Sequence, residues 1–110
     1  MLKIVFLVFA LVSTQYSVAN EQKMELCRAK LKRANQLEVL YDLDWKPRKM
    51  PQVVAGRTYF TMPFDAKEGF AETVNCFLVG GKDQCIDFEI KHWQTGKAVD
   101  KWSYCRLKPI

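Results

Sequence analysis

The chain has little of what a metal site or a nucleophilic enzyme needs. Its 110 residues include one histidine, His92, and none of its four cysteines forms a Cys-x-x-Cys pair. A zinc site and a cysteine–histidine nucleophile pair both need more of these side chains at suitable spacing. The acidic residues are dispersed, and no base is paired with a nucleophile. We therefore expect no enzyme, no metal and no cofactor.

A concentration of charge of one sign is missing as well. The 17 Lys and Arg residues exceed the 12 Asp and Glu residues by a small margin, and they are scattered along the chain. This distribution argues against a nucleic-acid partner. The sequence also lacks repeats, linkers and low-complexity segments, so we expect a single domain.

The longest apolar run lies at the N-terminus. Lys3 precedes residues 4–12, which are almost wholly apolar, and Ser17 and Ala19 put small residues where a signal peptidase acts. We predict a signal peptide over residues 1–19 and a mature domain over residues 20–110. The mature chain would be secreted, or periplasmic if the source is bacterial. The run is short for a transmembrane helix, so we expect no membrane contact after cleavage; an uncleaved anchor is the alternative.

The four cysteines all fall in the predicted mature domain, at Cys27, Cys76, Cys85 and Cys105. An even number in a small exported domain favours two disulfide bonds over free thiols. Such a domain has a small core, so disulfides would contribute substantially to its stability. Spacing alone leaves three pairings open.

Hydrophobic periodicity predicts a helix followed by strands. Over residues 21–35 apolar side chains recur at steps of three and four, with Asn20 placed to cap the helix. From residue 37 to residue 45 the period changes to two, which predicts a strand with one buried face. Further strands are expected at 57–62, 70–79, 84–93 and 98–107, with a polar connection at 65–69 and turns at 80–83 and 94–97. The fold class is therefore α+β, with one N-terminal helix packed across an antiparallel sheet of about five strands.

The segment between the first two strands resembles the inhibitory hairpin of the cystatins. It consists of Gln52, Val53, Val54, Ala55 and Gly56. A glycine can adopt positive φ and so allow a tight reversal, and the valines would stiffen the bend. The alternative is a strand that simply ends at a glycine.

Other parts of the chain are similar to the secreted cystatins. In that family a helix lies across a curled antiparallel sheet, and a Pro-Trp pair at a second hairpin touches the protease; His92 and Trp93 stand at the matching place. Cys85 and Cys105 bracket this segment as the family's C-terminal disulfide does, which would leave Cys27 to pair with Cys76. The competing set joins Cys76 to Cys85 and Cys27 to Cys105.

The resemblance implies a secreted, reversible inhibitor of papain-like cysteine proteases. Residues 52–56 would enter the active-site cleft, and Trp93, helped by His92, would pack beside them. The domain would be a monomer, with a strand-swapped dimer as a variant. The chain departs from the family in having no N-terminal glycine segment before the helix. The alternatives are a cystatin-fold binding protein without inhibition, such as a toxin, a defence-peptide precursor or an envelope or immunity protein, and an unrelated export protein.

Overall fold

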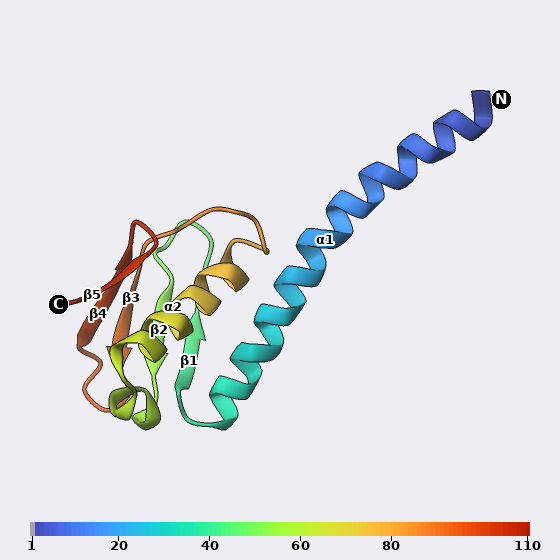
Figure 1. Cartoon of the computed structure of the whole chain (residues 1–110). Coiled ribbons are helices and arrows are strands. Elements are labelled where there is room, and N and C mark those ends of the chain that lie inside the picture. Colours follow the sequence, from blue (N-terminus) through green and yellow to red (C-terminus); the bar gives the residue numbers. More distant parts are fainter. Residues whose placement is uncertain (1) are drawn as a thin grey trace.

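The computed structural model describes the backbone of residues 2–110 and the side chains of residues 18–110. Two α-helices, one 3₁₀ helix and five strands follow in the order α1 (Leu2–Gln36), β1 (Leu40–Asp44), β2 (Gln52–Ala55), η1 (Arg57–Thr61), α2 (Phe64–Leu78), β3 (Phe88–His92), β4 (Ala98–Ser103) and β5 (Arg106–Pro109). Figure 1 shows both helices beside one sheet. The predicted α+β class, with an N-terminal helix packed on a five-stranded sheet, is confirmed. The likeness to the cystatin fold stays a resemblance.

The sheet has the order β1-β2-β3-β4-β5, so sequence neighbours are also neighbours in space. All pairs are antiparallel except β2 and β3, which run parallel. Parallel neighbours need a long crossover connection, and the chain supplies it through η1 and α2. The expectation of a purely antiparallel sheet is therefore wrong at the β2–β3 pair.

The crossover is the largest departure from the predicted elements. Residues 57–62 and 70–79 were both predicted as strands, but they form η1 and most of α2. Phe70, Val74 and Leu78 recur every fourth residue and are buried, which is the spacing of one helix face. The same segment also alternates in part, so its pattern fits both periods. Packing against the sheet and α1 stabilises the helical conformation of this segment.

Helix α1 is continuous across the predicted cleavage point, so Asn20 lies inside the helix and does not cap it. The predicted apolar face is present: Cys27 and Leu31 are buried, and Met24 and Ala34 are half-buried. The predicted signal segment lies largely outside the described side chains, and it stays a prediction. Within the described part of the chain, no helix has the length and apolar character needed to cross a bilayer.

Two disulfides brace the domain. Cys27 of α1 is bonded to Cys76 of α2, and Cys85, before β3, is bonded to Cys105 in the β4–β5 turn. Two disulfides were predicted, and of the three pairings that spacing left open the structure has the one that the resemblance to the cystatins implied. The two disulfides indicate folding in an oxidising compartment. Between the helices and the sheet, the largest fully buried side chains are Tyr59, Phe88, Ile90, Val53 and Val74.

Both edges of the sheet are blocked against the addition of another strand. At the β5 edge the Leu107 N–H donates to Glu68 Oε2 at 3.2 Å, and Pro109 has no N–H to offer. At the β1 edge Asn35 Nδ2 donates to the Leu40 carbonyl at 3.0 Å, and a register shift follows between Leu40 and Asp42. Covered, interrupted and proline-bearing edges disfavour strand pairing between molecules.

Candidate functional site

The segment that resembles the cystatin hairpin is an inner strand of the sheet. Residues 52–55 form β2, which pairs with β1 on one side and with β3 on the other. Val53 and Ala55 face the helices and have no exposed surface. The prediction of a projecting hairpin tip is therefore wrong, and the alternative of a strand that ends at a glycine describes it. The reason is the α2 crossover, which covers this strand.

Gly56 is required for close packing and not for a left-handed turn. Its φ of −84° and ψ of 178° are extended values that any residue adopts. A Cβ at this position would lie 2.2 Å from the carbonyl oxygen of Glu38, so a side chain cannot fit without movement of the backbone. The Gly56 N–H donates to the Val39 carbonyl at 2.9 Å. The glycine thus lets the end of β2 lie directly against the start of β1.

Trp93 and Gly56 lie at the same end of the sheet, as the sequence analysis anticipated. Because β2 and β3 run parallel, Ala55 stands opposite His92, and Trp93 follows immediately. The His92 and Trp93 rings stack at 4.2 Å with an interplanar angle of 12°, and Phe60 lies 4.5 Å from the His92 ring. The Gln94 N–H donates to His92 Nδ1 at 3.0 Å. One face of the Trp93 ring therefore packs on the His92 ring.

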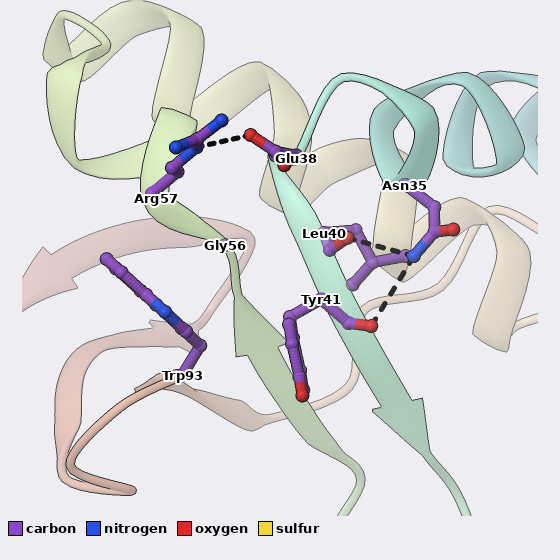
Figure 2. A pocket seen from close by; sticks show the side chains of 7 residues that line it. All are labelled: Asn35, Glu38, Leu40, Tyr41, Gly56, Arg57 and Trp93. Atoms are coloured by element: carbon purple, nitrogen blue, oxygen red, sulfur yellow. Dashed lines mark hydrogen bonds and ion pairs between the residues drawn. The ribbon is translucent and has the colours of Figure 1, made fainter.

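Tyr41 and Trp93 form the two walls of an open groove of about 440 Å³. Figure 2 shows both rings standing in front of the strands, with Gly56 between them. Tyr41 is 62% exposed, although the predicted alternation over residues 37–45 puts it on the same face as the buried Val39. The register shift between Leu40 and Asp42 turns it outward. No signal in the sequence marks this bulge, so sequence reasoning missed Tyr41 as a site residue.

One end of the groove is closed by an ion pair between Arg57 and Glu38 (Figure 2). Both side chains are largely exposed, so the pair fixes their positions more than it stabilises the domain. Asn35 also lines the groove, and its amide nitrogen is engaged by the Leu40 carbonyl. Glu38, Arg57 and Asn35 thus each make a polar contact in the wall of the groove, and the Tyr41 and Trp93 rings add apolar contact surface beside them.

Little in this arrangement supports bond-making chemistry. The lining residues are Asn35, Glu38, Leu40, Tyr41, Gly56, Arg57 and Trp93, and none is a nucleophile beside a base. Among residues whose side chains the structure describes, no group of three or more His, Cys, Asp or Glu is placed to hold a metal ion. What the groove can do is clasp a group between two rings.

Comparisons of the chain with protein-family models, with curated proteins and with solved structures find no match. The fold and the groove define a small α+β domain with two disulfides and an open groove between Tyr41 and Trp93.

Proposed function

We propose that the chain is an exported binding module that clasps an apolar side chain of a partner protein between Tyr41 and Trp93. The partner segment would lie extended across the end of β2, over Gly56. The observation that carries the proposal is the convergence of two aromatic rings on one open groove, Tyr41 from β1 and Trp93 from the turn after β3. Aromatic-lined grooves are a common way to bind extended peptide segments.

The polar groups of the groove favour a peptide over a sugar. A sugar presents many hydroxyl groups, each of which needs a hydrogen-bond partner when it is taken out of water. Here Glu38 and Arg57 are paired with each other, and Asn35 Nδ2 is bonded to the backbone of β1. The rings, by contrast, can stack on a proline or an aliphatic side chain without any hydrogen bond. The expected ligand is therefore an extended segment with one central apolar residue.

The test is a selection of displayed random peptides on the immobilised full chain, followed by calorimetry on the peptides obtained. Trp93→Ala should weaken binding by about 2 kcal/mol or more, which is roughly 30-fold, because truncation of a central aromatic anchor typically has this cost. Tyr41→Ala should act in the same direction. Circular dichroism shows whether each variant keeps the fold.

Tyr104→Ala is the matched control. Tyr104 is 88% exposed, and it lies in the β4–β5 turn at the opposite end of the sheet. Its removal should leave peptide binding unchanged. Peptides that bind the parent and Trp93→Ala equally well, or a library that yields no binder, would contradict the proposal.

Inhibition of papain-like cysteine proteases is a second candidate. It is favoured by one observation, the presence of Gly56 and Trp93 in a single groove. The burial of Val53 and Ala55 argues against a wedge made of residues 52–56. An inhibitor of this kind would have to contact the enzyme with the Tyr41 and Trp93 rings.

A titration of papain with the chain separates the two candidates. Stoichiometric loss of activity that Trp93→Ala relieves would support inhibition. Full activity in the presence of excess chain, together with peptide binding at the groove, would support the binding module alone.

A further inference from the structure

Two connections that are distant in sequence lie at the end of the sheet opposite the groove. The loop of residues 45–51 joins the end of β1 to the start of β2, and the start of β2 lies beside the start of β3. Because β3 and β4 are antiparallel, the β4–β5 turn at Tyr104 and Cys105 lies at this end too. Figure 1 shows both connections on the side toward which the N-terminal half of α1 projects. We call the 45–51 loop and this turn the loop pole.

The loop pole exposes large apolar side chains. Trp45 is 53% exposed, Met50 is 51% exposed and Tyr104 is 88% exposed. A domain with so small a core gains by burying such groups, so we infer from their exposure at one end of the sheet that something else covers them. Tyrosine and tryptophan are the residues that accumulate at membrane–water interfaces.

The same loop is basic. Lys46, Arg48 and Lys49 are all exposed, and residues 45–51 contain no acidic residue. Arg106, the first residue of β5, is paired with Glu68 at 3.7 Å, and Lys82 shares a pocket with Glu72 and Asp83. The positive charge of the loop pole therefore comes from the 45–51 loop. Basic side chains interleaved with exposed aromatic ones are what an anionic headgroup layer attracts.

The loop pole is held in shape by the fold. Pro47 and Pro51 restrict the 45–51 loop, and the Lys49 N–H donates to the Lys46 carbonyl at 3.2 Å. The neighbouring turn is tied to the chain before β3 by the disulfide between Cys85 and Cys105. Side chains fixed in an outward position lose little conformational freedom when they bind.

We propose that the loop pole docks on the surface of an anionic lipid bilayer. Trp45, Met50 and Tyr104 enter the headgroup region, and Lys46, Arg48 and Lys49 contact the phosphates. A single-stranded nucleic acid could also use basic and aromatic side chains, but Trp45 and Tyr104 are of the residue types that gather at membrane–water interfaces, which favours the bilayer. The Tyr41–Trp93 groove then faces away from the membrane and stays open to a partner.

The experiment measures sedimentation of the full chain with vesicles. One set contains phosphatidylcholine with a minority of phosphatidylglycerol, and the other contains phosphatidylcholine alone. The triple variant Lys46→Gln/Arg48→Gln/Lys49→Gln should lower the partition coefficient on anionic vesicles on the order of 100-fold, since each basic residue contributes about fivefold near such a surface. Every variant carries the same N-terminal segment, so its contribution cancels from the comparison.

The matched control removes the same charge elsewhere. Lys30→Gln/Lys32→Gln/Arg33→Gln changes three exposed basic residues in the last turns of α1, at the groove end, and should change binding by less than about threefold because screening limits the reach of distant charges. Equal losses in both triple variants would overturn the proposal. So would equal binding of the parent to both vesicle sets, or preferential binding to a single-stranded oligonucleotide.

Discussion

Tyr59 of η1 donates a hydrogen bond from its hydroxyl to the carboxylate of Asp100 in β4, although 41 residues separate them. Tyr59 has no exposed surface, and Asp100 is 9% exposed. The bond fixes the start of the crossover to the sheet and satisfies two polar groups that would be costly to bury alone. Burial, reinforced by the hydrogen bond to Asp100 and its charge, raises the pKa of Tyr59 well above its ordinary value.

The first prediction concerns the stability that this bond contributes. Tyr59→Phe keeps the ring and removes the hydroxyl, which leaves the buried Asp100 carboxylate without its partner. The free energy of unfolding should fall by about 1–3 kcal/mol. Denaturant unfolding at neutral pH measures the difference, and Tyr104→Phe at the exposed turn should change it by less than about 0.5 kcal/mol. An equal effect of the two substitutions would contradict the assignment.

The raised pKa of Tyr59 also predicts a dependence on pH. Above about pH 10 tyrosines in the unfolded chain lose their protons, while the native state keeps Tyr59 protonated. The contribution of Tyr59 is therefore complete below that pH and is lost progressively above it. The stability difference between the parent and Tyr59→Phe should shrink as the pH rises past 10. A difference that stays constant across this range would refute the linkage.

Two glycines offer opposite outcomes for the same substitution. Gly56→Ala places a Cβ against the Glu38 carbonyl and should destabilise the domain by about 3 kcal/mol or more. Gly69→Ala adds a Cβ inside α2 with nothing within 4 Å, and should stabilise the domain by roughly 1 kcal/mol. Thermal unfolding of the two variants gives the signs. Stabilisation by both would show that Gly56 is not packed as described.

The two disulfides should differ in their resistance to reduction. Cys27 is 8% exposed, whereas Cys85 and Cys105 are both exposed. A limited amount of dithiothreitol should therefore open the bond between Cys85 and Cys105 first, because thiolate attack needs access to a sulfur. Alkylation of the partly reduced chain followed by mass mapping identifies the bond. Early alkylation of Cys27 and Cys76 would contradict the described burial.

The two disulfides should also contribute different amounts to the free energy of unfolding. Cys27 and Cys76 are separated by 49 residues, and Cys85 and Cys105 by 20. Loop-closure entropy then gives a loss of roughly 4 kcal/mol for Cys27→Ala/Cys76→Ala and roughly 3 kcal/mol for Cys85→Ala/Cys105→Ala. Denaturant unfolding under oxidising conditions tests the order. A larger loss for the second pair would contradict it.

The sequence predicted those elements whose hydrophobic period is unambiguous. The amphipathic part of α1 and the alternation of Phe88 and Ile90 in β3 both agree with the structure. Both disulfides and the turns at 80–83 and 94–97 do so as well. The strand expected at 98–107 is a hairpin, because Tyr104 and Cys105 adopt positive φ and reverse the chain. Positive φ at two consecutive non-glycine residues has no clear signature in a sequence.

The larger error was to predict a strand where the structure has α2, because the apolar residues of this segment fit both the strand period and the helix period. The segment at 70–79 reads as a strand by local alternation and as a helix by its four-residue repeat of Phe70, Val74 and Leu78. Placing a helix there makes β2 and β3 parallel neighbours and buries Val53 and Ala55. The candidate site changed for the same reason. Trp93 stays in it, and Tyr41 joins it through a bulge that only the folded chain reveals.

The central claim is that residues 52–55 form an inner strand and that the contact surface is the groove beside them. Hydrogen exchange of the backbone amides, followed by NMR, tests this most directly. Amides of an inner strand paired on both sides should exchange only through global unfolding, as slowly as those of β3. We therefore expect strong protection within residues 53–55, whereas the amides of residues 46 and 48 in the exposed loop exchange rapidly. Rapid exchange throughout residues 52–56 would mean that this segment projects from the domain, and the account would be wrong.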